Sequence, residues 1–320
     1  MLKRIISGAV LIVIITVLII LGGIPFGAFM LVASLVSVYE LSRACRVHGQ
    51  SKSLNSQYTN IADLGDVNAT QTAKKEPVCN VLEVVAYITT IALYALITCY
   101  SGILSKAQGS DSALGITSRL SSGDAILGLM VLFILVILGI YVVTYPKYDI
   151  RQVMSIIFIE FYAPLMVSFI YRLRVEGGNT SIGMVLAFLV IITASGSDMS
   201  AYFVGVNLGK HRLAPVLSPK KSVEGSVGGV LGAALLNTVF ALALCAFDVL
   251  ELKFIWIFAI IGAVGSIISQ IGDLAASAIK RSFDIKDYGN IIPGHGGAMD
   301  RLDSILVVAP IIYIMIELLK

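Results

Sequence analysis

The chain has 320 residues, of which 57% are hydrophobic and only 13% are charged. Soluble domains carry charge on about a quarter of their residues, so this composition excludes an ordinary soluble protein. The net charge of +3 is too small to indicate a nucleic-acid partner, and we expect none. Apolar runs of about 18 or more residues recur along the chain. The composition therefore predicts an all-α polytopic membrane protein.

Nine apolar segments are long enough to cross a membrane as helices. They are residues 5–21, 26–41, 84–103, 125–145, 153–173, 182–203, 227–247, 254–279 and 302–319. The first segment follows Lys3 and Arg4, as a signal peptide does, but its apolar run is too long for one, and residues 22–25 do not form a cleavage site. We therefore expect a retained first helix that forms a hairpin with the second.

Positive charge is distributed unevenly between the two sides of this predicted topology. Of the 23 Lys and Arg residues, 17 lie at the N-terminus or in the loops on its side, and 6 lie on the other side. Cytoplasmic segments carry the excess of Lys and Arg. The pattern predicts a multi-pass protein of a bacterial-type cell membrane, with the N-terminus and the later charged loops in the cytosol.

The topology divides the chain into four regions. We predict a membrane hairpin over residues 1–46, a polar cytosolic loop over 47–83, middle membrane helices over 84–181, and a catalytic membrane region over 182–320. The polar loop is rich in Ser, Asn, Gln, Thr and Asp and has no hydrophobic periodicity, which is typical of a flexible segment.

The sixth span and the loop after it contain the first group of candidate residues. Ala194, Asp198, Ala201 and Gly205 share one helical face, so Asp198 is the one charge among small residues. It is either a functional group or a structural hydrogen-bonding group. The following loop places cations and hydroxyls beside a helix start, which favours phosphate binding; an ordinary basic loop beside anionic lipids is the alternative. The candidates in it are Ser218, Lys220, Lys221 and Glu224.

The eighth span carries a polar stripe. Its members fall within roughly 40° of one line along an α-helix, and we expect such a stripe to face a water-filled cavity. They are Ser266, Ser269, Gln270, Asp273, Ser277 and Lys280.

The last span begins with two further carboxylates. Asp300 and Asp303 share a helical face, and with Asp273 they form a set that suits Mg²⁺, which takes oxygen ligands and bridges to substrate phosphates. In the alternative, Asp300 caps the helix and Asp303 forms an ion pair. His295 lies in the preceding glycine-rich turn, where it either donates to a phosphate or stabilises the turn.

The segment from Ser277 to Ser304 resembles the signature of the phosphatidate cytidylyltransferases, or CDP-diacylglycerol synthases, and the segment from Asp198 to Gly225 is similar to the same family. The chain departs from that pattern at Ala276, where many members carry Glu, and at Ala298, where a larger apolar residue is usual. The residues that carry the C-terminal resemblance are Ser277, Lys280, Arg281, Lys286, Asp287, Pro293, Gly294, His295, Gly296, Gly297, Asp300, Arg301, Asp303 and Ser304.

The resemblance implies transfer of a cytidylyl group from CTP to phosphatidic acid, giving CDP-diacylglycerol and pyrophosphate in phospholipid biosynthesis. It implies Mg²⁺ at Asp273, Asp300 and Asp303, with K⁺ as a candidate second cation. The expected partners are CTP, phosphatidic acid and the bilayer, and a homodimer is left open. The residues expected to be catalytic are Asp198, Lys280, Arg281, Asp287 and His295. The residues expected to contact substrate phosphates are Ser218, Lys220, Lys221, Glu224, Ser277, Lys286 and Arg301.

Two other functions compete with this one. An ion-coupled transporter would use Asp198, Glu160 and Asp273 as a relay across the membrane. Glu160 lies near the middle of the fifth span, where it is either such a functional group or a hydrogen-bonded contact to a neighbouring helix. A CTP-using polyprenol or phytol kinase would instead release CDP. The charged groups cluster toward one face of the membrane, which favours the cytidylyltransferase.

Overall fold

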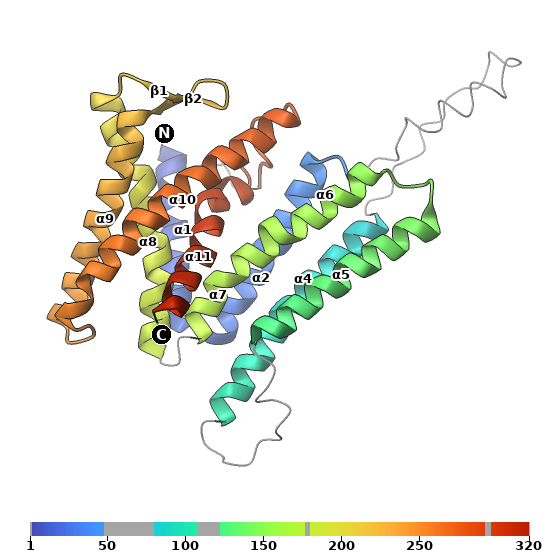
Figure 1. The fold of residues 1–320 in the computed structure, drawn as a ribbon, viewed down its shortest axis with the longest axis horizontal. Coiled ribbons are helices and arrows are strands. Elements are labelled where there is room, and N and C mark those ends of the chain that lie inside the picture. The colour runs from blue at the N-terminus through green and yellow to red at the C-terminus, as the bar shows by residue number, and fades with distance from the viewer. Residues whose placement is uncertain (1, 48–79, 108–121, 177–179, 292–295, 320) are drawn as a thin grey trace, which may run out of the picture. The chain divides into compact units, whose positions relative to one another are not determined.

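A computed structural model of the protein describes residues 2–47, 80–107, 122–176, 180–291 and 296–319. The predicted polar loop lies almost entirely outside these residues. The chain forms two compact units, one of Met1–Ser37 with Ala163–Lys320 and one of Val38–Tyr162. Figure 1 shows the helices that make up each unit.

Each of the nine predicted spans is helical. In the described part of the chain, seven helical segments are long and apolar enough to cross a membrane, which confirms an all-α polytopic membrane protein. The segments α1 and α11 are not among those seven, so nine crossings remain a prediction. The helices are α1 (Leu2–Leu21), α2 (Gly23–Ala44), α4 (Val81–Ala107), α5 (Ser122–Thr144), α6 (Ile150–Glu160), the π-helix η1 (Phe161–Leu165), α7 (Met166–Glu176), α8 (Thr180–Leu208), α9 (Val223–Ala246), the 3₁₀-helix η2 (Leu252–Phe254), α10 (Ile255–Ser282) and α11 (Met299–Leu318).

The larger unit is organised around α8, α9 and α10, which pack against one another, while α11 contacts α7, α8 and α10. A Cβ atom on Gly225 of α9 would lie 2.8 Å from the Ala201 carbonyl oxygen of α8, so only glycine allows this close approach. Deeper in the same pair of helices, the buried Asn237 amide donates to Thr193 Oγ1 at 3.1 Å. This hydrogen bond satisfies polar groups that a membrane would otherwise leave without a partner.

A short β-hairpin joins α8 to α9, where the sequence predicted only a basic loop. Strands β1 (Arg212–Ala214) and β2 (Ser218–Ser222) are antiparallel. Ser222 then caps α9, because its Oγ accepts a hydrogen bond from the Gly225 amide at 3.1 Å. Figure 1 shows the hairpin at the same end of the larger unit as the start of α1, and α11 ends at the opposite end. A chain that crosses a membrane an odd number of times has its two ends on opposite sides, as this arrangement does. Which end faces the cytosol remains a prediction.

In the smaller unit, Glu160 at the end of α6 is fully buried. Thr90 Oγ1 of α4 lies within hydrogen-bonding distance of both carboxylate oxygens, at 3.2 and 3.3 Å. Glu160 therefore makes the hydrogen-bonded contact to a neighbouring helix that was one of its two interpretations. The helix then widens into η1 around Pro164, whose ring nitrogen has no hydrogen to donate to the helix.

Candidate active site

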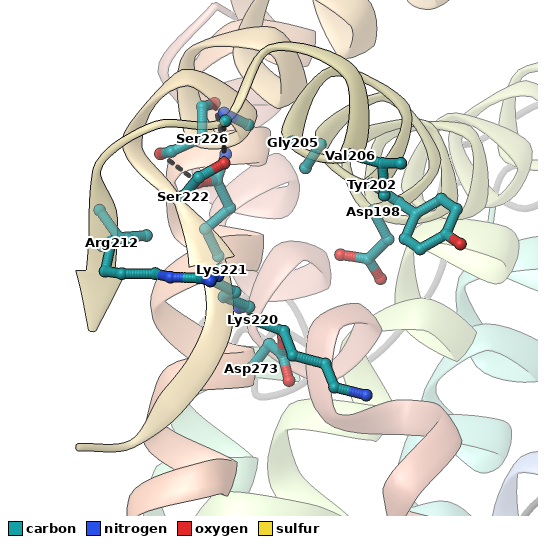
Figure 2. Close-up of a pocket in the computed structure, with 15 residues that line it drawn as sticks. Asp198, Tyr202, Gly205, Val206, Arg212, Lys220, Lys221, Ser222, Ser226 and Asp273 are labelled. Carbon is teal, nitrogen blue, oxygen red and sulfur yellow. Dashed lines mark hydrogen bonds and ion pairs between the residues drawn. The ribbon is translucent and has the colours of Figure 1, made fainter. Parts of the chain in front are cut away.

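A cavity of about 700 Å³ lies where the end of α8, the β-hairpin, the start of α9 and the middle of α10 meet (Figure 2). This volume is in the range of small-molecule sites. Four of the residues predicted from sequence line it. They are Asp198, Lys220, Lys221 and Asp273.

The central contact in the cavity is an ion pair between Lys221 of β2 and Asp273 of α10. Their side chains are 26% and 29% exposed, so the pair is only partly screened by water. The charges of both residues act on Asp198, whose carboxylate accepts a hydrogen bond from Ser304 Oγ of α11 at 3.1 Å. The cavity thus brings together charges from three separate elements, α8, β2 and α10.

Asp303 of α11 links this cavity to a second charged group. Its carboxylate accepts a hydrogen bond from the Ser304 amide at 2.8 Å. The charges of Asp273, Asp198 and Lys280 all act on it. Asp198, Asp273 and Asp303 therefore form one set of mutually repelling carboxylates, which a cation would stabilise.

The second charged group is centred on Asp300, whose side chain is 4% exposed. One of its oxygens accepts from Lys280 Nζ at 2.9 Å. The other accepts from the amides of Tyr288, at 2.9 Å, and Gly297, at 3.0 Å. The Tyr288 hydroxyl in turn donates to the Ala276 carbonyl at 3.0 Å. Asp300 thereby joins Tyr288 and Gly297 of the connection to Lys280 of α10.

The donor chemistry of the site fits Mg²⁺ better at Asp198, Asp273 and Asp303 than at Asp300. Mg²⁺ binds carboxylate oxygens and retains several waters, and the three repelling carboxylates offer such oxygens beside the cavity. Both oxygens of Asp300 already accept hydrogen bonds from the chain itself. In the described part of the chain, no three acidic, histidine or cysteine side chains lie close enough together to hold a metal ion. A metal site, whether at Asp273, Asp300 and Asp303 or at Asp198, Asp273 and Asp303, thus remains a prediction that requires these carboxylates to move closer together.

Comparison with known proteins identifies the family of this chain. Residues 2–319 match the model of the cytidylyltransferase family. The chain belongs to this family. The match confirms the resemblance that the segments from Asp198 to Gly225 and from Ser277 to Ser304 carry.

Three relatives of this cytidylyltransferase-family chain bear the name phosphatidate cytidylyltransferase. The protein of Bacillus subtilis is 43% identical over 136 residues, which are 42% of this chain and 49% of the relative. That of Staphylococcus saprophyticus is 38% identical over 148 residues, 46% of this chain and 53% of the relative. That of Thermotoga maritima is 34% identical over 180 residues, 55% of this chain and 61% of the relative. The chain thus spans about half the length of the curated relatives that it matches.

The other residues implied by the family resemblance lie away from the cavity lining. Glu224 accepts hydrogen bonds from the Lys210 amide at 3.0 Å and from the His211 amide and ring, so it anchors the start of the hairpin. This contact indicates a positioning role for Glu224, where the sequence predicted phosphate binding. His295 lies outside the described residues. The remaining predicted residues that the structure describes away from this lining are Ser218, Ser277, Lys280, Arg281, Lys286, Asp287, Asp300, Arg301 and Asp303.

The polar stripe of α10 faces the cavity only in part. Ser266 and Ser269 are fully buried, and Ser266 Oγ lies 2.7 Å from Ser197 Oγ of α8. Gln270 donates to the Ser226 carbonyl of α9 at 3.1 Å. The expectation of a water-filled cavity along the whole stripe was therefore wrong, because its deeper half joins three helices. The cavity begins at Gln270 and includes Asp273.

Several lining residues were missed as site candidates by the sequence reasoning. Tyr202 follows Asp198 by four residues and therefore shares its helical face, a signal that helical periodicity could have found. Arg212 lies in the basic loop after the sixth predicted span, where the sequence does not distinguish it from the neighbouring cations. The site role of Ser226 depends on the packing of α9 against α10, for which the sequence offers no local signal. All three line the cavity.

Proposed function

We propose that this chain transfers a cytidylyl group from CTP to phosphatidic acid, giving CDP-diacylglycerol and pyrophosphate in phospholipid biosynthesis. The observation that carries the proposal is that Lys220 and Lys221 line the same cavity as Asp198 and Asp273. Cations and carboxylates in one cavity suit a reaction between two phosphate-bearing molecules in which metal ions take part. Membership of the cytidylyltransferase family supports the same reaction.

In this reaction an oxygen of the lipid phosphate attacks the α-phosphorus of CTP. A new phosphorus–oxygen bond forms, and the bond from the α-phosphorus to the bridging oxygen of pyrophosphate breaks. The attacking phosphate is already an anion, so no strong base is required. The main obstacle is repulsion between two polyanions, which Arg212, Lys220 and Lys221 at the cavity wall offset.

The proposed cofactor is Mg²⁺, with K⁺ as a candidate second cation. Asp198, Asp273 and Asp303 would hold Mg²⁺, which supplies positive charge that neutralises the phosphate oxygens. Asp300 would act differently, by keeping Lys280 and the Tyr288 amide in place. This assignment exchanges Asp300 for Asp198 in the predicted ligand set, because both oxygens of Asp300 contact donors of the chain.

We propose that the cavity faces the cytosol. CTP is soluble in water, and the positive charges of the predicted cytosolic segments include the hairpin cations. The lipid phosphate would reach the cavity at the membrane surface while its acyl chains stay in the bilayer. A reporter cysteine at exposed Lys220 that reacts with membrane-impermeant thiol reagents only in inverted vesicles would support this orientation. Labelling from the outside of intact cells would contradict it.

The test of the function uses the purified full chain in lipid nanodiscs with CTP labelled with ³²P at the α-phosphate, phosphatidic acid and Mg²⁺. We expect label in the lipid fraction, an equal amount of pyrophosphate, and loss of both on adding EDTA. Asp273→Asn should abolish the transfer. Release of CDP in the presence of an isoprenoid alcohol, without labelled phosphatidyl product, would identify a kinase. Absence of any nucleotide chemistry would overturn the proposal and favour a transporter.

A further inference from the structure

The two amides that follow the C-terminal end of α8 donate to a side chain of α9. In a continuing helix, the amides of Lys210 and His211 would donate to the carbonyls of Val206 and Asn207. Both amides instead donate to the Glu224 carboxylate, at 3.0 and 3.2 Å. Glu224 thus diverts two donors from the end of α8. The Val206 and Asn207 carbonyls remain at the negative end of the helix dipole as potential acceptors.

This end of α8 forms one wall of the cavity. Gly205, Val206 and Gly209 line the cavity there. Tyr202 lies one turn earlier on the same face, and Figure 2 shows its ring beside Val206 and Asp198. The Tyr202 side chain is 67% exposed, so the ring has free surface for a ligand. This wall therefore combines an aromatic ring with the C-terminal end of a helix.

The opposite wall has a different chemistry. Arg212, Lys220 and Lys221 come from the hairpin, and Figure 2 shows Arg212 and Tyr202 on opposite sides of the cavity. The cavity is thus cationic on the hairpin side and aromatic on the α8 side. A nucleoside triphosphate has the same division, with phosphates at one end and a planar base at the other.

We propose that the end of α8 is the subsite for the nucleobase, an inference that rests on the proposed function. The ring of Tyr202 stacks on the pyrimidine, and the carbonyl of Val206, a lining residue, accepts a hydrogen bond from the exocyclic amino group of cytosine. Uracil carries a carbonyl oxygen at that position, which has no hydrogen to donate to the Val206 carbonyl. The subsite therefore selects CTP over UTP, because a mismatched polar group loses its hydrogen bonds.

The first experiment measures the KM for CTP and for phosphatidic acid with the full chain in nanodiscs. Base–aromatic stacking is worth ~1–3 kcal/mol, so Tyr202→Leu should raise the KM for CTP by roughly 5- to 100-fold and leave that for phosphatidic acid unchanged. Tyr202→Phe keeps the ring and should resemble the wild type. Phe247→Leu is the matched control, because Phe247 follows the far end of α9, is 80% exposed and does not line the cavity. It should change neither KM.

The second experiment compares CTP with UTP as substrates. Glu224→Ala frees the Lys210 and His211 amides to bind the end of α8, so the ratio of kcat/KM for CTP over UTP should fall by roughly 10-fold. A thermal melt in detergent confirms that the variant is folded. Glu251→Ala is the matched control, because Glu251 forms a largely exposed ion pair with Lys253 outside the cavity lining, and it should keep the wild-type ratio.

Three outcomes would overturn the subsite while leaving the proposed function intact. They are equal use of CTP and UTP by the wild type, an unchanged KM for CTP in Tyr202→Leu, and a changed KM for phosphatidic acid in that variant, which would place the lipid at Tyr202. Absence of labelled lipid from the wild type with every nucleotide would instead overturn the function itself, and the subsite with it.

Discussion

Lys221 of β2 forms an ion pair with Asp273 of α10, inside the cavity that Asp198 also lines. The ammonium group lies among carboxylates that repel one another, and its charge also acts on Asp198. A hairpin cation therefore compensates part of the negative charge of the helices. When an anionic substrate binds, the same ammonium is within reach of its phosphates.

Replacing this lysine tests its role in CTP use. Lys221→Ala should lower kcat/KM for CTP by roughly 100- to 1,000-fold, the effect of removing one preorganised donor to developing negative charge. Lys253→Ala is the control, because Lys253 forms a largely exposed ion pair with Glu251 at 2.6 Å, and it should retain wild-type kinetics. An unchanged CTP dependence in Lys221→Ala would assign this lysine to lipid contact alone.

Asp300 is predicted to act through structure. Asp300→Asn removes the partner of Lys280, whose side chain is only 14% exposed, and should destabilise the fold by about 3 kcal/mol. It should also lower activity by disturbing the segment that Tyr288 and Gly297 join to Asp300. A thermal melt measures the loss of stability. The double variant Lys280→Met with Asp300→Asn should regain much of the stability but not the activity; full activity in Asp300→Asn would contradict this role.

The close contact of α8 with α9 requires Gly225. Gly225→Ala places a Cβ atom 2.8 Å from the Ala201 carbonyl oxygen and 3.1 Å from the Gly205 Cα atom, which should destabilise the fold by ~1–3 kcal/mol and lower turnover. Gly128→Ala is the control, because a Cβ there meets nothing within 4 Å. Melting temperature and turnover should decrease in the first variant only. Equal melting temperatures of Gly225→Ala and the wild type would show that α9 can shift to accommodate the Cβ atom without loss of stability.

Substitutions of Glu160 distinguish the proposed enzyme from an ion-coupled transporter. Its hydrogen bond with Thr90 is a structural contact within one unit, so Glu160→Gln should keep an acceptor for Thr90, and its melting temperature and cytidylyl transfer should stay near those of the wild type. Glu160→Ala should destabilise the fold by about 2 kcal/mol, because it leaves a cavity and removes that acceptor. Loss of turnover in a folded Glu160→Gln variant would instead assign a functional proton to this residue.

The sequence by itself determined the class of protein and the positions of the apolar helices, seven of which are long and apolar enough to cross a membrane in the described part of the chain. This was possible because a helix in a bilayer satisfies its own backbone hydrogen bonds, so apolar length alone identifies it. The sequence also identified Asp198, Lys220, Lys221 and Asp273 as candidate residues, since charges are costly in apolar helices and stand out there.

Only the tertiary structure decided which of these charges meet. The sequence grouped Asp300 with Asp273 and Asp303, but packing of the segment between α10 and α11 joins Asp300 to Lys280 and to two backbone amides. It likewise assigned Glu224 to phosphate, whereas the hairpin directs it to the end of α8. The physical reason is that a side chain's partners depend on the approach of segments far apart in the chain, and hydropathy and local spacing do not encode that approach.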